Sequence, residues 1–162
     1  MTQLPSSPRT IIVAVGDIRT RKRFSTALEH AGHNTLEVTS EDELIAQTSR
    51  SQPAADLVVL DLQIWSPHTH VAQAFKTHAV KATIVILSGS VRSAAEVREL
   101  SNLGIDSFIN EHCAEKHIVP SLVPRLFPDS FDRRTSTRVT LNLPVTFRFA
   151  DTVATAPTLN VS

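Results

Sequence analysis

Apolar positions in the first 127 residues follow two alternating periods. Five short runs are β-rich and either apolar throughout or alternating, which predicts strands at residues 10–15, 34–39, 56–61, 83–87 and 105–109. Apolar residues recur at helical spacing between and after them, which predicts helices at residues 18–31, 40–48, 71–78, 90–103 and 114–127. This alternation predicts an α/β fold with a five-stranded, doubly wound parallel sheet that is covered on both faces.

Several single residues mark the ends of these helices. Gly32 is expected to close the first helix in the left-handed conformation. Ser40 and Glu43 have the spacing of a capping box at the start of the second helix. Pro120 and Pro124 fall inside the last helix, where each removes a backbone donor, so we expect that helix to be short or kinked.

Composition excludes several classes of function. The 162 residues are 41% hydrophobic, and the 16 basic residues balance the 16 acidic ones. Zero net charge and 5% aromatic residues argue against a DNA- or RNA-binding protein, and a single cysteine excludes an intramolecular disulfide. No run is long enough to span a bilayer, and residues 1–9 lack the pattern of a secretory signal. We therefore expect a cytoplasmic protein with a disordered tail at residues 1–9.

Polar residues cluster where the predicted strands end. Asp17 follows the first strand, Asp61 ends the third, Ser88 follows the fourth and Glu111 follows the fifth. Ligands of open parallel sheets bind at the carboxyl ends of the strands. An aspartate that ends a buried strand is partly desolvated there, and a hydroxyl across the sheet could donate a hydrogen bond to a phosphoryl group carried by that aspartate.

These positions resemble a response-regulator receiver domain, which is a flavodoxin-like fold, over residues 10–127. The apolar strand ending in Asp61 resembles the family's phosphoacceptor strand, Ser88 falls at its Ser/Thr switch, and Phe108 falls at its aromatic switch position. The resemblance implies phosphorelay signal transduction in a two-component system. Its partners would be proteins, namely a sensor kinase or a downstream effector. Because receivers often pair through their last helix and strand, a homodimer is a further expectation.

The sequence also departs from the receiver pattern. The family's acidic pair, which holds Mg²⁺, falls on Val15 and Gly16, so Asp17 and Asp61 are the only acidic metal ligands that the resemblance supplies. The family's lysine after the fifth strand is replaced by Glu111, whose negative charge should repel a phosphoryl group. We therefore expect a degenerate receiver that acts as a docking or regulatory module and not as an enzyme. A functional phosphoacceptor switch on Asp61 is the alternative.

Simpler interpretations exist for the same residues. Asp61 could cap the loop that follows its strand, and Asp17 could cap the first helix, where aspartate is favoured. The basic run at residues 19–23 is predicted to be a solvated helix face.

The C-terminal part has a different character. Residues 128–132 are predicted to be a linker, and residues 139–149 and 153–161 are β-rich with no helical period. Pro157 should break the second strand or confine it to an edge.

Residues 133–162 resemble the opening of a PilZ domain, whose members bind cyclic di-GMP. The resemblance rests on an Arg-x-x-x-Arg motif and a second motif about 20 residues later, and it implies a ligand site at Arg133, Arg134, Arg138, Asn160 and Ser162. Arginine forks suit phosphate oxygens and a guanine edge. Because about 30 residues cannot close a barrel, we expect an incomplete PilZ segment with weak affinity for cyclic di-GMP. A protein-interaction scaffold that binds neither a phosphoryl group nor a nucleotide is the remaining alternative.

Overall fold

The computed structural model describes residues 7–49, 54–64, 81–102, 105, 107–128, 144–149 and 152–157. The chain divides into two units, Met1–Ser130 and Phe131–Ser162, which are described separately. The predicted helix at residues 71–78, most of the N-terminal tail and most of the linker lie outside the described residues.

The first unit is built on a five-stranded sheet in the order β2-β1-β3-β4-β5. All four neighbouring pairs are parallel, which confirms the predicted α/β sheet. The strands are β1 (Thr10–Ala14), β2 (Asn34–Val38), β3 (Leu57–Leu60), β4 (Thr83–Leu87) and β5 (Ser107–Ile109). Strand β4 has its predicted bounds, and the other four are shorter than predicted by one to two residues. The polar residues of interest therefore lie just beyond the strand ends.

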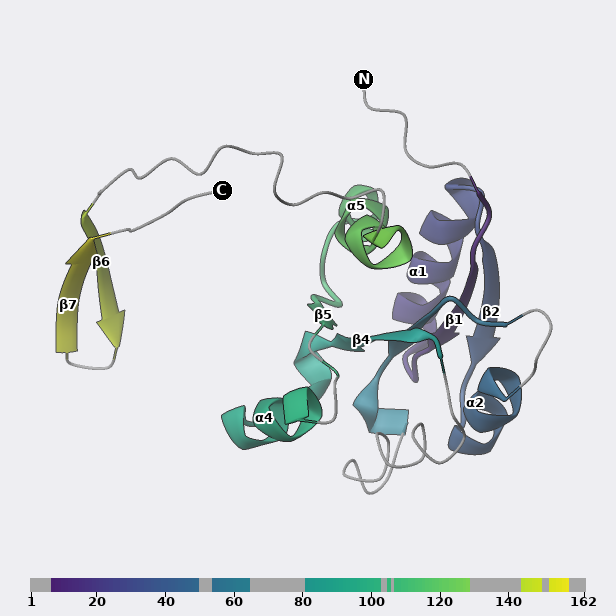
Figure 1. The fold of residues 1–162 in the computed structure, drawn as a ribbon, viewed down its shortest axis with the longest axis horizontal. Coiled ribbons are helices and arrows are strands. Elements are labelled where there is room, and N and C mark those ends of the chain that lie inside the picture. Colours follow the sequence, from purple (N-terminus) through teal and green to yellow (C-terminus); the bar gives the residue numbers. More distant parts are fainter. Residues whose placement is uncertain are drawn as a thin grey trace. The chain divides into compact units, whose positions relative to one another are not determined.

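Helices cover both faces of this sheet (Figure 1). The described helices are α1 (Ile18–His30), α2 (Glu41–Thr48), α4 (Ala94–Asn102) and α5 (Glu115–Leu126). One hydrophobic core joins the sheet to α1 and α5, and a second joins it to α2 and α4. In the described ranges no helix has the length and apolarity to cross a membrane.

The two cores follow from the two-residue period of the strands. In β1, Ile11 and Val13 belong to the α1–α5 core, while Ile12 and Ala14 belong to the α2–α4 core. All four side chains are fully buried, because this central strand has a neighbour on each side and helices on both faces.

The helix-end signals of the first half are confirmed. Gly32 has φ +86°, and its N–H donates to the Glu29 carbonyl at 2.9 Å, as expected for a left-handed helix end. The Ser40 hydroxyl accepts from the Glu43 N–H at 3.3 Å, and the Glu43 carboxylate accepts from the Thr39 N–H at 3.1 Å. This reciprocal pair is the capping box of α2.

The predicted start of α4 at residue 90 is wrong. Residues Ser88–Ser90 form a short 3-10 turn, and the α-helix begins at Ala94. A second capping box sets this start: the Ser93 hydroxyl accepts from the Glu96 N–H at 3.2 Å, and the Glu96 carboxylate accepts from the Arg92 N–H at 2.6 Å.

Helix α5 spans 12 residues despite its two prolines, so the expectation of a short helix is wrong. Because proline has no N–H, the carbonyls four residues before Pro120 and Pro124 receive no helical hydrogen bond. These are the carbonyls of residue 116 and of Pro120 itself. Both of those residues are exposed, so water can satisfy their carbonyl oxygens. The buried face of α5 carries none of the prolines and consists of Ile118, Leu122, Val123 and Leu126.

The described part of the second unit is a pair of antiparallel strands, β6 (Pro144–Phe149) and β7 (Thr152–Pro157). They overlap the predicted strands at residues 139–149 and 153–161, whose remaining residues, 139–143 and 158–161, lie outside the described ranges. Pro157 is the last residue of β7 and pairs with Pro144, so it terminates the ladder as its missing donor requires.

Candidate functional site

A pocket of about 310 Å³ lies at the carboxyl ends of the strands in the first unit. Its wall comes from the segments that follow β1, β3, β4 and β5, as the parallel topology requires. The polar and charged residues that line it include Asp17, Asp61, Gln63, Ser90, Glu111 and His112. The pocket therefore gathers three carboxylates, two of which are the predicted metal ligands.

Asp61 is buried, with 6% of its surface exposed. Its Oδ2 accepts from the Gly16 N–H at 3.3 Å and its Oδ1 accepts from the Gln63 N–H at 2.9 Å. Its own N–H donates to the Ala14 carbonyl at 2.9 Å, which extends the β1–β3 ladder to the pocket. Within the described ranges no Lys, Arg or His side chain pairs with this carboxylate.

Gly16 allows the backbone to approach Asp61. A Cβ at this position would lie 3.2 Å from Cγ2 of Ile64 and 3.6 Å from Oδ2 of Asp61. A larger side chain would therefore crowd both the carboxylate and the turn after β3. The glycine departs from the acidic pattern of the receiver family and leaves an N–H, not a second carboxylate, facing Asp61.

Asp17 caps α1. Its Oδ2 accepts from the Thr20 N–H at 2.7 Å. Hydrogen bonds from the backbone and side chain of Thr20 lower the pKa of this exposed carboxyl, and the Arg19 charge adds to the effect. The interpretation of Asp17 as a helix cap is confirmed.

The magnesium site that the receiver resemblance implies would rest on two carboxylates, Asp17 and Asp61, which both line the pocket. Mg²⁺ needs an octahedral shell of oxygen ligands, usually with at least one or two carboxylates. In the described ranges, no group of three His, Cys, Asp or Glu side chains is arranged to hold a metal ion. Both oxygens of Asp61 and one oxygen of Asp17 already accept backbone hydrogen bonds.

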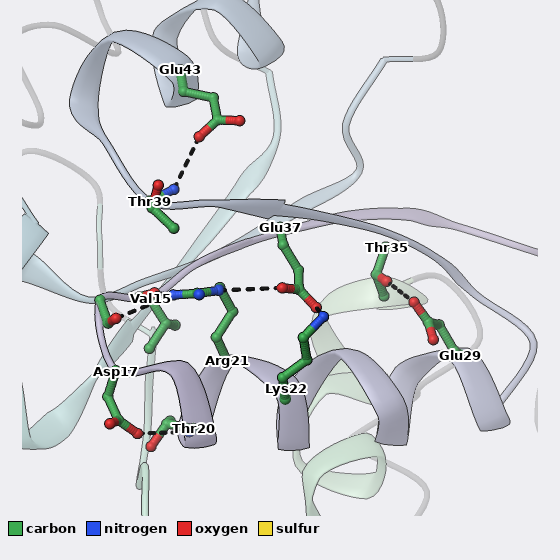
Figure 2. Close-up of polar contacts among 11 residues, drawn as sticks. Val15, Asp17, Thr20, Arg21, Lys22, Glu29, Thr35, Glu37, Thr39 and Glu43 are labelled. Carbon is green, nitrogen blue, oxygen red and sulfur yellow. Dashed lines mark hydrogen bonds and ion pairs between the residues drawn. The ribbon is translucent and has the colours of Figure 1, made fainter.

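Arg21, on helix α1, holds the turn after β1 by hydrogen bonds to its backbone carbonyls (Figure 2). Its Nη1 donates to the carbonyls of Val15 at 2.7 Å and Gly16 at 3.1 Å, and its Nε lies 3.2 Å from Oε2 of Glu37 on β2. Lys22 binds the other oxygen of Glu37 at 3.0 Å.

The prediction of a solvated basic face at residues 19–23 is therefore wrong for Arg21, which is 9% exposed. Its spacing could have shown this, because Arg21, Phe24 and Leu28 lie three and seven residues apart, on one side of a helix. Phe24 and Leu28 are the buried residues of that side.

Glu111 reaches the pocket from the loop after β5. An Asx turn shapes this loop: Oδ1 of Asn110 accepts from the His112 N–H at 2.8 Å, and the Asn110 carbonyl accepts from the Cys113 N–H at 3.1 Å. Arg23 of α1 donates from Nη2 to the Glu111 carbonyl. The backbone of Glu111 is thus fixed from both its own loop and helix α1.

The Glu111 side chain accepts hydrogen bonds from two donors that follow β4. Its Oε2 accepts from the Gly89 N–H at 2.8 Å and from the Ser88 hydroxyl at 3.3 Å. Partial burial alone would raise the pKa of this carboxyl, but the backbone N–H groups, the His112 charge and the Ser88 hydroxyl together hold the pKa below its usual range. Glu111 is therefore an anion at neutral pH, and an ionised carboxylate only accepts hydrogen bonds.

The remaining predicted site residues are separated from this pocket or undescribed. Phe108 lies on β5 and is 37% exposed. Ser88, at the predicted switch position, contacts the site through Glu111. The predicted nucleotide ligands Arg133, Arg134, Arg138, Asn160 and Ser162 lie outside the described residues.

Solved structures with the same arrangement of strands and helices are response-regulator proteins. A CheY-like receiver domain from Methanospirillum hungatei superposes with a TM-score of 0.65 at 16% identity, over 76% of this chain and 98% of that one. The N-terminal domain of a response regulator/sensory box/GGDEF protein from Carboxydothermus hydrogenoformans gives 0.62 at 13% identity, over 75% and 97% of the two chains. The first unit has the receiver fold.

A third neighbour with the receiver fold is a response regulator from Burkholderia pseudomallei, described with a phosphorylated aspartic acid, a calcium ion and citrate. It superposes with a TM-score of 0.58 at 14% identity, over 75% of this chain and 72% of that one. No protein-family model and no curated protein matches the chain. The likeness is thus one of fold, and the chemistry must be argued from the residues of the pocket.

Proposed function

We propose that the first unit is a receiver-type signalling module that works by docking a protein partner and not by efficient phosphotransfer. The observation that carries this proposal is the Glu111 carboxylate on the Ser88 hydroxyl and the Gly89 N–H. A phosphoryl group on Asp61 would be stabilised by donors and cations around its oxygens. Here an anion already occupies two of those donors, and it adds negative charge to the pocket.

The cations near the pocket support the same proposal. Arg21 binds backbone carbonyls and Glu37, and Arg23 binds the Glu111 carbonyl, so neither guanidinium is paired with Asp61. In the described ranges no third His, Cys, Asp or Glu side chain joins Asp17 and Asp61 in a metal-binding group. A module of this kind is a regulatory protein and not an enzyme, and its partners would be a sensor kinase or a downstream effector of a bacterial-type signalling system.

Intact mass tests this proposal directly. The full chain is incubated with Mg²⁺ and acetyl phosphate beside a receiver known to label, with Asp61→Asn as the matched control. We expect no phosphoryl-sized gain in mass in either form of this chain. A gain in the wild type that is lost in Asp61→Asn would reject the docking proposal.

Such a gain would support the alternative of a phosphoacceptor switch on Asp61. One observation favours that alternative: Asp61 is a buried carboxylate that lines a 310 Å³ pocket, and no cation among the described residues pairs with it. The Burkholderia neighbour is described with a phosphorylated aspartic acid. Wild-type labelling would mean that Glu111 moves aside when a phosphoryl donor binds.

A second proposal concerns residues 133–162, for which we retain cyclic di-GMP as the ligand. The support is the arginine motif in the sequence and the antiparallel pair β6–β7 that follows it. Calorimetry of the full chain should give weak binding that disappears in the Arg134→Ala, Arg138→Ala double variant. Absence of binding would favour a scaffold that binds neither ligand, whereas equal binding by both proteins would show that Arg134 and Arg138 do not form the ligand site.

A further inference from the structure

The contacts of Glu111 resemble those of a bound ligand more than those of a surface side chain. One carboxylate oxygen accepts both a backbone N–H and a hydroxyl at the end of β4, 22 and 23 residues away in sequence. The side chain is 19% exposed although it belongs to a loop. Long-range charge-assisted hydrogen bonds of this kind are stronger than neutral ones and tie two loops together.

The Gly89 position is shaped for this carboxylate. A Cβ on Gly89 would lie 1.6 Å from Oε1 of Glu111, well inside contact distance. The backbone of Gly89 is outside the left-handed region, so its conformation does not itself require glycine. What the glycine provides is the space that Glu111 fills.

Of these two donors, the Gly89 N–H belongs to a residue that lines the pocket of Asp61, and the Ser88 hydroxyl comes from the residue before it. Gly89, Asp61 and Glu111 all line this pocket. With Glu111 withdrawn, the Ser88 hydroxyl and the Gly89 N–H would form an open site for an oxyanion beside Asp61. With Glu111 in place, both donors are satisfied and a second anion would meet like charge.

We propose that Glu111 is a tethered ligand: its carboxylate fills a two-donor oxyanion site at Ser88 and Gly89 and excludes external phosphoryl-type oxyanions from the pocket. This inference rests on the proposed function, because it names the contact that keeps the pocket closed to phosphotransfer. It also predicts that a single substitution on either side breaks the contact, and that removal of the Glu111 carboxylate opens the site.

Two variants break the contact from opposite sides. Glu111→Ala removes the carboxylate, and Gly89→Ala leaves it intact but takes the space that it fills. Because the displaced atoms are the end of a flexible side chain, Gly89→Ala should fold normally. Glu115→Gln, which removes an exposed carboxylate at the start of α5, is the matched control for charge.

The first readout is the amide N–H of Gly89 in NMR spectra of the full chain. We expect hydrogen exchange at Gly89 to accelerate at least tenfold in both alanine variants and to be unchanged in Glu115→Gln. Unchanged exchange in both alanine variants, with their spectra otherwise folded, would overturn the proposal.

The second readout is the binding of beryllofluoride, a tetrahedral anionic probe, with Mg²⁺ present in every sample. Glu111→Ala should respond at probe concentrations at least tenfold lower than the wild type and Glu115→Gln require, whereas Gly89→Ala should gain less, because its methyl occupies part of the space that the carboxylate leaves. Equal responses from all four proteins would overturn the exclusion of external anions. Acetyl phosphate labelling of the wild type, in contrast, would reject the proposed function, so the two failures are distinguishable.

Discussion

Strand β3 is flanked by two aspartates, five residues apart, that differ in their burial and in whether a cation pairs with them. Asp56, before the strand, accepts from the Thr10 N–H at 2.8 Å and pairs with Nη1 of Arg9 at 3.0 Å. Asp61, after the strand, also accepts backbone N–H groups but pairs with no described cation. Its surface is 6% exposed, whereas the Asp56 side chain is 32% exposed. The more deeply buried carboxylate is thus the one without a countercharge.

This difference separates an end of the sheet whose charges are paired from the end at which we propose the functional site. At the amino end, the Arg9 guanidinium also lies 5.0 Å from the centre of the Phe127 ring, so charge and packing support each other. At the carboxyl end, the nearby guanidinium of Arg21 binds carbonyl oxygens and Glu37. A buried carboxylate left unpaired costs stability, and such costs are commonly retained where a ligand or partner uses the group.

The largest loss of stability is expected when Arg21, which binds the turn at the carboxyl end of β1, is replaced. Arg21→Met should lower the free energy of unfolding by roughly 3 kcal/mol, because it leaves two carbonyl oxygens and Glu37 without their buried partner. Urea denaturation of the full chain measures the change. Lys22→Met is the control, since Lys22 binds the same carboxylate from a largely exposed position and should cost less than about 1 kcal/mol. Equal losses of unfolding free energy in both variants would show that Arg21 stabilises the turn no more than a surface residue does.

The second-largest loss of stability is expected at the amino end of β3. Asp56→Asn should lower the free energy of unfolding by about 1–2 kcal/mol, because a partly exposed ion pair and a charge-assisted bond to the Thr10 N–H are both weakened. A double-mutant cycle with Arg9→Met in urea isolates the coupling between the two side chains. Coupling indistinguishable from zero would remove the contrast between the two ends of β3.

Much of this architecture follows from the sequence, because apolar periodicity and helix caps are local signals. The strands of the first unit were predicted to within two residues, and the Ser40–Glu43 capping box gave the start of α2. The start of α4 was missed although Ser93 and Glu96 carry the same spacing, because the chain between residues 88 and 93 is also compatible with a helix. The placement of Glu111 depends on contacts across more than 20 residues, which no local pattern encodes.

A smaller effect depends on pH and involves the Glu111 contact. Because the folded protein holds the pKa of Glu111 below its ordinary value, the stabilisation is complete above about pH 5 and is lost as the pH falls through the folded pKa. Glu111→Gln should therefore lower the free energy of unfolding by about 1 kcal/mol at neutral pH and by progressively less in acid. Denaturation curves between pH 3 and pH 7 measure this difference.

Subtracting the variant from the wild type is essential here, because the pKa values of Asp17 and Glu37 are lowered as well and make the wild-type curve fall in acid by themselves. In the described ranges, the groups that contact Glu111 are the Gly89 N–H, the Ser88 hydroxyl, the His112 ring at 3.6 Å and, through the backbone, Arg23. A difference that stays constant down to pH 3 would mean that the charge of Glu111 contributes nothing to its contact with Gly89.

The smallest change in stability is expected for Asp61, the residue that the alternative function would phosphorylate. Asp61→Asn removes a buried charge, which favours folding, but the amide can accept only one of the two N–H groups that the carboxylate accepts. These effects oppose each other, so we expect the free energy of unfolding in urea to change by less than about 0.5 kcal/mol. A loss above about 2 kcal/mol would instead make Asp61 a structural loop cap, equivalent to Asp56 at the other end of β3. Near-zero change beside the loss in Asp56→Asn would mean that the fold does not need the Asp61 charge, and that a ligand or partner is the remaining reason to keep it.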